Sequence, residues 1–393
     1  MRILIALTYY RPHYSGLTIH AEREARALVD RGHRVVVLTS RFDNKLPARE
    51  IRDGVEIVRP KVLLHISKGV IMPTMLVHAW KLARQSDVIH LHAPQLDAAP
   101  IAVLSRWLGK PVVLTYHCDM RLPDGLVHQL ANSASNFANH ITARAANLIV
   151  HNTRDYAEHS PFLRQYLEKV HPILPPVEVK QSSQAEVDAF RHKYGVRTGQ
   201  RLIGMAARLA TEKGVEYLAE ALPRVLEKYP RARVLFVGPY QNIVGEEQYA
   251  QRLAPLIESL GEHWTFLGVL APDEFAAFFR ACEVTVLPSI NSTESYGLVQ
   301  VESMACGTPV VATDLPGVRV PVQLSGMGKI VPPADPEKLA EAIIAILDHP
   351  GEYRSHAEAI IQHSTPAAVA TEYEAVFERA IHQIIQNTRK AYS

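Results

Sequence analysis

The chain has 393 residues, of which 47% are apolar and 21% are charged, and its formal net charge is +2. This length and composition are typical of a water-soluble globular protein with two domains. The three cysteines, Cys118, Cys282 and Cys306, are too few and too scattered for a disulfide framework or a zinc site. We therefore expect a reducing compartment, the cytoplasm, and we expect no nucleic-acid partner.

The sequence contains no stretch that we expect to span a membrane. The longest apolar candidate, residues 62–80, is interrupted by His65, Lys68 and His78. Residues 1–7 are too short for a signal peptide and are typical of a buried strand.

Positive charge is concentrated in the N-terminal half of the chain. Residues 1–175 hold 22 Lys and Arg against 14 Asp and Glu, whereas residues 176–393 hold 20 against 26. A basic half of this kind could face anionic lipid head groups or an anionic acceptor. The excess could equally be spread over all faces and carry no function.

The first 39 residues predict a strand, a loop, a helix and a second strand. The strand covers residues 2–8, the turn-rich loop 9–17, the helix 18–31 and the second strand 34–39. Such a β-α-β unit implies a parallel sheet. The loop contains no G-x-G-x-x-G, so a dinucleotide site is poorly supported.

Two further strands, at residues 87–91 and 111–115, each lead into a polar loop. The first loop begins at His92 and the second contains His117 and Asp119. Open α/β sheets bind ligands at the carboxyl ends of their strands. A histidine there could accept a proton or bind a sugar hydroxyl, although any one of 19 histidines is more often incidental.

The middle of the chain predicts an amphipathic helix, a strand and a linker. Residues 123–146 could contact a membrane or a lipid-linked acceptor, but an ordinary core-facing helix is the favoured interpretation, because the single cation Arg144 gives little attraction to a membrane. Residues 147–150 predict a strand. The proline-rich segment 171–179 predicts the connection between two domains, with the boundary near residues 175–180.

The second domain repeats the β/α pattern. A strand at residues 201–207 leads to Arg208 and Lys213, just ahead of a helix at residues 215–229. These two cations could neutralise a diphosphate, although the spacing alone is common on protein surfaces. The remaining predicted elements are strands at 234–238, 264–268 and 284–287 and helices at 273–280, 336–348 and 367–386.

The segment after the strand at 284–287 carries two carboxylates, Glu294 and Glu302. If both lay on one helix, their separation would be about 12 Å on a single face. Between them Tyr296, Gly297 and Leu298 would offer backbone N–H groups to a phosphate at a helix start. Hydroxyl acceptors beside an anion site suit a nucleotide sugar, whereas two solvated surface carboxylates are the simpler alternative.

This segment, followed by the Gly-Thr-Pro-Val-Val of residues 307–311, resembles the E-x7-E signature of retaining glycosyltransferases of family 4, the group 1 glycosyltransferases. The resemblance covers nearly the whole chain. It implies the α/β GT-B fold, with two Rossmann-like domains facing a central cleft. Residues 1–177 would bind the acceptor and 178–366 the donor, and the last helix, within residues 367–393, would cross back to the N-terminal domain.

The resemblance also implies roles for individual residues. His117 would position the donor sugar, Arg208 and Lys213 would bind the diphosphate, Glu294 would bind the sugar hydroxyls and Glu302 the ribose. The family usually has two glycines in its first loop, whereas this chain has Ser15 and Gly16. The complete set of expected donor contacts is Gly16, Gly238, Leu267, Gly268, Glu294, Ser295, Tyr296, Gly297, Leu298, Val299 and Glu302, and that of acceptor contacts is Tyr9, Tyr10, His92 and Asp119.

The chain contains no Asp-x-Asp pair that could hold a divalent ion on the diphosphate. We therefore expect a metal-independent hexosyltransferase without a cofactor, using the nucleoside diphosphate sugar as co-substrate. Retention of anomeric configuration, assisted by the leaving phosphate, is implied by the resemblance. The acceptor would be a lipid-linked or cell-envelope glycan, reached from the cytoplasm or from the inner face of the membrane. The sequence does not distinguish among UDP, GDP and ADP as the nucleotide of the donor.

Three alternatives compete with this interpretation. A sugar-nucleotide 2-epimerase of the GT-B fold would share the nucleotide, but the E-x7-E signature is not expected there. A glycogen or sucrose-phosphate synthase would be longer. A non-catalytic nucleotide-sugar-binding or scaffold protein would have no need of Glu294, Glu302, Arg208 and Lys213 together.

Overall fold

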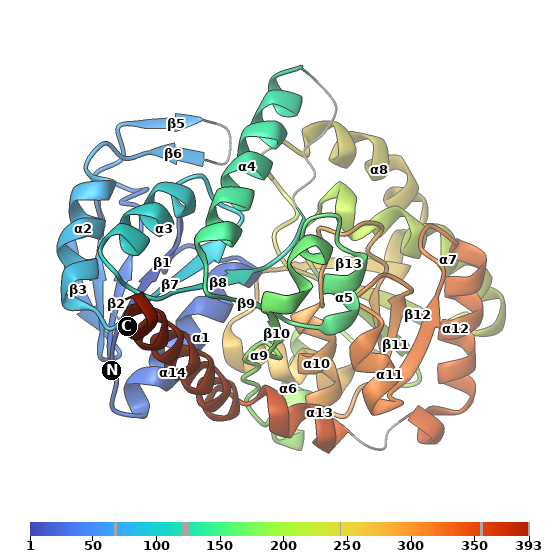
Figure 1. Ribbon diagram of the computed structural model, residues 1–393. Coiled ribbons are helices and arrows are strands. Elements are labelled where there is room, and N and C mark those ends of the chain that lie inside the picture. The colour runs from blue at the N-terminus through green and yellow to red at the C-terminus, as the bar shows by residue number, and fades with distance from the viewer. Residues whose placement is uncertain (67–68, 120–125, 244, 354–356, 392–393) are drawn as a thin grey trace. The chain divides into compact units, whose positions relative to one another are not determined.

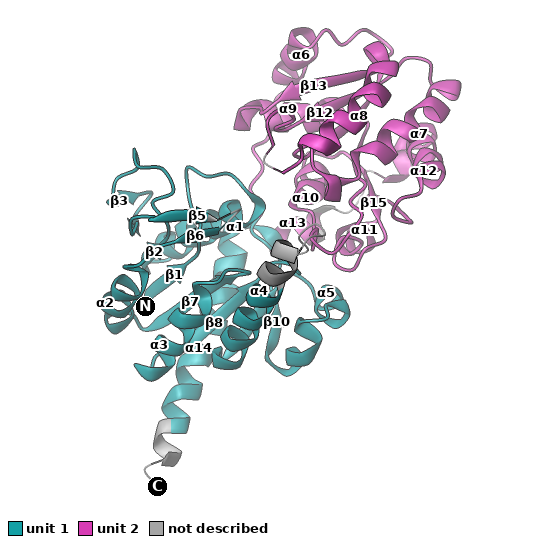
Figure 2. Ribbon diagram, turned by 90° about the horizontal axis from the view of Figure 1, so that it is seen from above, with its two compact units in different colours: residues 1–176, 364–393 teal, residues 177–363 magenta. Residues whose placement is uncertain are grey.

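The computed structural model describes residues 1–66, 69–119, 126–243, 245–353 and 357–391. It contains two compact units, the first formed by Met1–Pro176 with Ser364–Ser393 and the second by Val177–His363 (Figures 1 and 2). The chain thus passes to the second unit one residue before the boundary expected at 177/178 and returns within three residues of the one expected at 366/367. Among the described residues, no helix is both long enough and apolar enough to cross a membrane.

The first unit is an α/β sandwich. In its described residues the strands are β1 (Arg2–Ala6), β2 (Arg34–Leu38), β3 (Arg49–Arg52), β4 (Val55–Val58), β5 (Leu64–Ile66), β6 (Gly69–Ile71), β7 (Val88–Ala93), β8 (Val112–Tyr116), β9 (Leu148–His151) and β10 (Val170–Pro172). Its helices are α1 (Gly16–Asp30), α2 (Met75–Gln85), α3 (Ala98–Trp107), α4 (Leu126–Ala145), α5 (Arg154–His159), the 3-10 segment η1 (Leu163–Lys169) and α14 (Pro366–Ala391).

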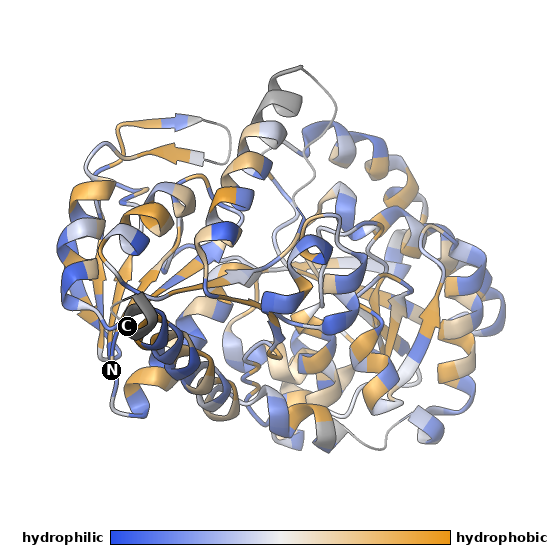
Figure 3. Ribbon diagram, viewed as in Figure 1, coloured by the Kyte–Doolittle hydropathy of each residue, from blue (hydrophilic) through white to orange (hydrophobic). Residues whose placement is uncertain are grey.

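The described strands of the main sheet lie in the order β10-β9-β8-β7-β1-β2-β4-β3, and only β3 runs antiparallel to its neighbour. Alternate residues face opposite layers because the side-chain period of a strand is two. On β1, Leu4 and Ala6 pack in the core beneath α2 and α3, whereas Ile3 and Ile5 pack beneath α1 and α14. Helices therefore cover both faces, and the strands are largely apolar (Figure 3).

Helix α14 packs on α1, β7 and β8 of the first unit. Its buried face includes Tyr373 and Phe377, both 0% exposed. Near its middle, Glu374 accepts two hydrogen bonds from the guanidinium of Arg31, with Nε to Oε1 at 2.7 Å, and lies 2.5 Å from Nε2 of His33. The predicted helix 367–386 is therefore present and continues to Ala391.

We expect Glu374→Gln to lower the melting temperature at pH 7. The hydrogen bonds from Arg31 and the nearby His33 lower the pKa of Glu374 below its ordinary value of 4.5, although partial burial opposes this shift. A lowered folded-state pKa gives stability above the unfolded-state pKa, and this stability is lost as the pH falls through the folded-state pKa. The melting difference between the variant and the parent should accordingly be present at pH 7 and shrink below pH 4.5; a difference unchanged at low pH would contradict this account.

The second unit is a smaller α/β sandwich. Its described strands are β11 (Arg201–Ala206), β12 (Ala232–Val237), β13 (Trp264–Gly268), β14 (Val284–Leu287), β15 (Val310–Thr313) and β16 (Gly328–Val331). Its helices are α6 (Gln184–Lys193), α7 (Val215–Lys228), α8 (Glu247–Ser259), α9 (Pro272–Ala281), α10 (Leu298–Ala305), α11 (Val320–Ser325), α12 (Pro336–Asp348) and α13 (Ala357–Ser364), with short 3-10 segments η2 (Thr211–Lys213), η3 (Gly261–His263) and η4 (Pro350–Tyr353).

All described strands of this sheet are parallel, in the order β13-β12-β11-β14-β15-β16. One face packs against α7, α8 and α12 around Met205, Phe236 and Val286. The other face packs against α6 and α9 around Leu235 and Phe278. The chain passes from β11 to β12 on one side and later returns to β14 on the other side of β11, which makes the β11/β14 pair the topological switch point of the sheet.

The long apolar runs correspond to strands and helices, as predicted. The strands at 264–268 and 284–287 and the helix at 336–348 have the predicted bounds, and other predicted bounds differ by one to several residues. Strands β3, β4, β5, β6 and β16 were not predicted, and the segment 171–179 was expected to be a connection although β10 pairs with β9 there. The first residues of the predicted helix 123–146 lie outside the described residues, and α4 begins at Leu126.

Candidate active site

The loops that leave β11 and β14 meet at the switch point of the second unit. They are joined by a hydrogen bond from the backbone N–H of Ile290 to the carbonyl oxygen of Glu212, at 3.1 Å. From β15, Thr313 Oγ1 donates to the carbonyl oxygen of Ser289 at 2.7 Å. The topology thus brings two segments far apart in sequence into one crevice of the kind where open α/β sheets bind ligands.

Four charged side chains line this junction in two pairs. Lys213 Nζ lies 2.6 Å from Glu294 Oε2, and these side chains are 21% and 14% exposed. Arg208 forms an ion pair with Glu212, one helical turn further along. Three of these residues were predicted from the sequence, whereas Glu212 was missed. In this structure the two cations are therefore held by carboxylates and are preorganised at the ends of β11 and β14.

Glycines permit the close approach of these loops. Gly214 has φ = +61° and separates η2 from α7, and a Cβ atom there would lie 2.2 Å from the carbonyl oxygen of Pro288. Gly238, at the end of β12, has φ = +130°, and its Cβ would lie 2.0 Å from the carbonyl oxygen of Ala207. The Gly238 N–H donates to the carbonyl oxygen of Gly268, at 2.8 Å, which places the predicted donor residues Leu267 and Gly268 beside it.

We expect Gly238→Ala to destabilise the protein by about 2–3 kcal/mol or to prevent folding. The backbone conformation is strained for any L side chain, and the opposing atom belongs to the backbone and cannot move aside cheaply. Gly16→Ala is the matched control, because a Cβ atom added to Gly16 would meet no other atom within 4 Å and the φ of Gly16 is not positive. Urea unfolding should show a change for Gly16→Ala within about 0.5 kcal/mol; equal losses in both variants would contradict the assignment.

The start of α10 completes the junction. Gly297 has φ = +79° and is the N-cap of the helix, so Ser295 and Tyr296 precede it in the loop and Leu298 and Val299 form its first turn. The first turn of a helix has N–H groups without intrahelical acceptors. Glu294 lies in the loop before this helix. The separation of about 12 Å expected between Glu294 and Glu302 required both residues to lie on one helix, so it does not apply.

Glu302 lies in the second turn of α10 and is 9% exposed. Burial, followed by the negative charge of Glu302 one turn away, raises the pKa of the Cys306 thiol to about 12, although Arg280 opposes this shift. Cys306 is therefore a neutral thiol at physiological pH and is poorly suited to act as a nucleophile.

In the first unit, the predicted loop residue Gly16 begins α1. The preceding Ser15 has extended backbone angles (φ = −155°, ψ = 164°) and caps the helix. Its side chain accepts a hydrogen bond from the N–H of Thr18, and the Thr18 hydroxyl accepts one from the N–H of Ser15. Serine at this position therefore needs no left-handed backbone and contributes a capping box.

The polar residues after β7 and β8 do not all reach the surface. His117 is half-buried, and its Nε2 lies 2.9 Å from Nδ1 of His92. Burial, with the nearby His20, lowers the pKa of His117 well below its ordinary value. Asp119 accepts hydrogen bonds through Oδ1 from Tyr116 and Ser160, while its Oδ2 is buried.

Two predicted acceptor contacts require correction. The His92 side chain is 0% exposed because β7 turns it towards α1, and so it cannot touch an acceptor in this structure. Tyr10 is 3% exposed, whereas Tyr9 is half-buried and stacks on His13.

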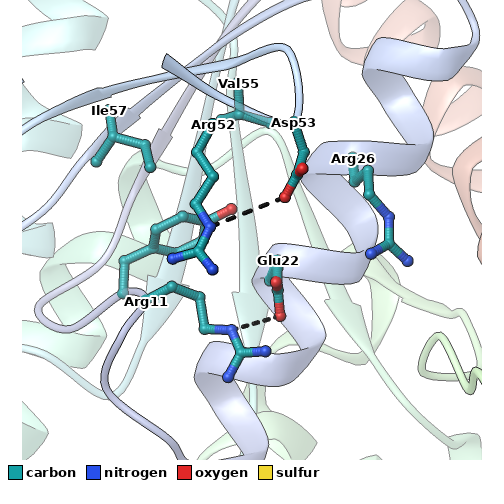
Figure 4. A pocket seen from close by; sticks show the side chains of 8 residues that line it. Arg11, Glu22, Arg26, Arg52, Asp53, Val55 and Ile57 are labelled. Carbon is teal, nitrogen blue, oxygen red and sulfur yellow. Dashed lines mark ion pairs between the residues drawn. The ribbon is translucent and has the colours of Figure 1, made fainter. Parts of the chain in front are cut away.

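Figure 4 shows the small pocket that Tyr10 helps to line. Two ion pairs lie beside it, Arg11 with Glu22 at 2.7 Å and Arg52 with Asp53 at 3.9 Å. Its volume of about 10 Å³ accommodates no more than about one water molecule. This pocket is therefore not the place where a sugar binds.

The solved structures that resemble this one are glycosyltransferases. The crystal structure of Anabaena HepE in complex with UDP-glucose superposes with a TM-score of 0.77 at 21% identity, covering 96% of this chain and 100% of that one. WaaG, a glycosyltransferase involved in lipopolysaccharide biosynthesis, superposes with a TM-score of 0.66 at 17% identity, covering 97% and 99%. These likenesses establish the fold.

Comparison of the sequence with family models identifies both units as parts of a glycosyltransferase. Residues 14–180 match the family model Glycosyltransferase Family 4, and residues 186–363 match Glycosyl transferases group 1. D-inositol 3-phosphate glycosyltransferase 1 of Catenulispora acidiphila is 28% identical over 370 residues, covering 89% of this chain and 86% of that protein. Phosphatidyl-myo-inositol mannosyltransferase of Mycobacterium leprae is 28% identical over 370 residues, covering 88% and 87%. The chain therefore belongs to glycosyltransferase family 4, the group 1 glycosyl transferases, and is a hexosyltransferase with the GT-B fold.

Proposed function

We propose that the protein transfers a sugar from a UDP- or GDP-sugar to a hydroxyl of a lipid-linked or cell-envelope acceptor, with retention of configuration and without a metal ion on the diphosphate. The observation that supports this most is the junction of β11, β14 and α10. It holds Arg208 and Lys213 beside the carboxylate of Glu294 and the start of a helix. HepE, which has the same fold, was crystallised with UDP-glucose.

In the proposed reaction, the acceptor oxygen forms a bond to the anomeric carbon as the bond from that carbon to the diphosphate oxygen breaks. The acceptor proton passes to a phosphate oxygen of the leaving nucleoside diphosphate on the same face of the sugar. Arg208 and Lys213 stabilise the negative charge that grows on the diphosphate, and preorganised charge of this kind is usually the largest contribution to catalysis. Glu294 orients the sugar hydroxyls, and His117 retains the positioning role that the resemblance implies.

The donor proposal can be tested without knowledge of the acceptor. UDP or GDP should raise the melting temperature, since a ligand that binds only the native state stabilises it. An α-linked donor sugar should then be hydrolysed slowly, and proton NMR should show α-hexose before mutarotation. EDTA should leave both results unchanged. A β-hexose as the first product would exclude retention, and a nucleotide shift that requires added Mg²⁺ would exclude the metal-free diphosphate site.

We also propose that the first unit binds an anionic membrane through α2, α3 and α4. An apolar groove of about 810 Å³ lies over these helices, which show apolar segments in Figure 3. Trp80 and Trp107 on its walls are 37% and 77% exposed. The groove is lined by Leu76, Val77, Trp80, Ala99, Pro100, Val103, Leu104, Trp107 and Ile141.

The charges around this groove indicate the kind of membrane. The sequences of α2, α3 and α4 contain no Asp or Glu, whereas Lys81, Arg84, Arg106 and Arg144 are exposed on them. Exposed tryptophan among cations is typical of membrane-interface surfaces, and each cation near an anionic surface contributes about 1 kcal/mol. Part of the excess of Lys and Arg in residues 1–175 therefore lies on this surface.

Tryptophan fluorescence tests this surface directly. The chain has three tryptophans, and the third, Trp264, is buried in the second unit at 6% exposure. Vesicles of phosphatidylcholine with phosphatidylglycerol should shift the emission to the blue, less so at high salt. Trp107→Ser should weaken vesicle binding with unchanged melting temperature. Equal binding to phosphatidylcholine alone, or no shift with either vesicle, would contradict an anionic docking surface.

A further inference from the structure

A second cluster of ionisable side chains lies inside the first unit, between α1 and β7. Glu24 projects from α1, and His90 and His92 project from the same face of β7 because they are two residues apart. All three side chains are 0% exposed. The position was not apparent from the sequence, where Glu24 was one residue of a predicted helix and His90 one of a predicted strand.

One atom of each residue points to a common centre. The Nδ1 atom of His90 lies 2.8 Å from Oε1 of Glu24, and the Nε2 atom of His92 lies 3.6 Å from Oε2 of Glu24. The three potential ligand atoms lie within 4.8 Å of one another. In a tetrahedral site with bonds of about 2.1 Å the ligand atoms are about 3.4 Å apart, so small side-chain movements would place them around one ion.

These atoms make no hydrogen bonds among the described residues. Both carboxylate oxygens of Glu24, Nδ1 of His90 and Nε2 of His92 are buried without a hydrogen-bond partner. The close approach of His90 to Glu24 therefore lacks the alignment of a hydrogen bond, although its distance would permit one. Four buried polar atoms left in this state would be costly unless another group satisfied them.

The other ring nitrogens are held by neighbours in the way that metal-binding histidines usually are. The Nε2 atom of His90 lies 2.7 Å from Oγ1 of Thr115, which lies 3.0 Å from the hydroxyl of Tyr373. The Nδ1 atom of His92 lies 2.9 Å from Nε2 of His117. Each histidine is thus oriented through one nitrogen while the other faces Glu24.

The charge balance of the cluster also favours a cation. The ion pairs of Glu24 in the described structure involve histidines alone, so a cation between them would balance its charge.

We propose that Glu24, His90 and His92 bind one divalent transition-metal ion, and that Zn²⁺ fits the site. Two imidazoles and one carboxylate are a common donor set for such ions. His20 is not one of the three ligands, because its Nε2 lies 3.2 Å from the hydroxyl of Tyr373, closer than the 3.6 Å to Oε2 of Glu24. Full burial makes this a structural site, separate from the diphosphate site of the second unit.

The ion would connect three elements of the first unit, the strand β7 and the two helices α1 and α14 that cover the same face of the sheet. It would join α1 to β7 directly and α14 indirectly, through Thr115 and Tyr373. With Nε2 of His92 bound to the metal, Nδ1 would carry the proton and donate it to Nε2 of His117. The metal would thus set the tautomer of His117, a positioning effect on a residue whose own role rests on the proposed function.

Metal analysis of untagged full-length protein tests the site. After dialysis against EDTA, incubation with Zn²⁺ and removal of excess metal, mass spectrometry should find about one zinc per chain. The melting temperature should be about 5–10 °C higher than that of the metal-free protein. With Co²⁺, visible bands of a tetrahedral ion should appear without a thiolate charge-transfer band, which excludes binding by the three free cysteines.

Variants locate the metal. Glu24→Gln and His90→Gln should each reduce the zinc content at least tenfold, whereas His151→Gln, at an equally buried histidine outside the cluster, should retain it. The wild-type cobalt spectrum decides the question even if a cluster variant fails to fold. Wild-type protein that takes up neither Zn²⁺ nor Co²⁺ would overturn the proposal and leave Glu24 with its histidine neighbours alone. Zinc retained by both cluster variants would also overturn it.

Removal of this metal is distinguishable from loss of the donor site. EDTA should lower the melting temperature of the ligand-free protein, yet leave the additional rise caused by UDP or GDP in place. A nucleotide shift without any zinc would support the proposed function alone, and zinc without a nucleotide shift would support the metal site alone.

Discussion

Replacing Lys213 with alanine is expected to reduce kcat by about 10²–10³-fold, the loss typical of removing one preorganised group that stabilises transition-state charge. Lys213 is held by Glu294 at 2.6 Å in a side-chain environment that is only 21% exposed. Its charge therefore acts in a region where water screens it less than at the surface. Because negative charge on the diphosphate grows as the sugar leaves, the effect should fall on kcat more than on KM.

Lys228→Ala is the matched control for this experiment. Lys228 ends the same helix that follows Lys213 and pairs with Asp348 at 2.7 Å, but its side chain is 53% exposed. Steady-state kinetics should find Lys228→Ala within twofold of the parent. A Lys213→Ala enzyme of near-parental kcat would remove this residue from the catalytic machinery.

Glu294 and Lys213 should also prove non-additive. Removing Lys213 leaves the Glu294 carboxylate, 14% exposed, without its ammonium partner. The double variant Lys213→Ala, Glu294→Gln should consequently lose less activity than the product of the two single losses, because contacting charged residues act as a unit. Additive losses would indicate that the ion pair separates before catalysis and that each residue then contacts the donor independently.

The sequence predicted three of the four charged residues of this junction but not their pairing. The strand at 284–287 is a short apolar run, and the cations follow a similar run, so both could be placed at strand ends. Lys213 and Glu294 are 81 residues apart, and only the strand order brings them together. Glu212, the partner of Arg208, was missed although the two are four residues apart, because a carboxylate near an arginine is usual on any protein surface.

The sequence-based predictions that were wrong in the first unit failed for a different reason. His92 and Tyr10 were expected to follow strands, where polar or aromatic residues often bind ligands, but the position of a residue near a strand end does not show how deeply its side chain is buried. The structure includes His92 in β7 itself. His92 lies on the face of β7 that α1 and α14 cover, and α14 comes from the far end of the chain. The buried position of Glu24 has the same origin. Strands β3 to β6 and β16 were missed because they are short and most contain a charged or polar residue, such as Glu56 in β4, whereas the equally short strand at 284–287 contains no charged residue.

Glu302→Gln is expected to weaken nucleotide binding by about 10–100-fold and to change kcat much less. A carboxylate that accepts hydrogen bonds from the ribose hydroxyls would contribute about 1.5–3 kcal/mol, and an amide retains the shape without the charge. The ribose does not react, so this contact should be equally strong in the ground state and the transition state and should affect KM. Isothermal titration with UDP or GDP, whichever shifts the melting temperature, measures the loss.

A change in the ligand separates this role from a structural one. The 2′-deoxy nucleotide should bind the parent protein more weakly than the ribonucleotide, and Glu302→Gln should remove most of that difference. Glu220→Gln, at an exposed carboxylate of α7, should preserve the difference. Because Glu302 is 9% exposed, a misfolded variant would lower both affinities together and would also lower the melting temperature. An undiminished preference for the ribonucleotide in a folded Glu302→Gln protein would place the ribose elsewhere in the second unit and leave Glu302 with a purely structural role.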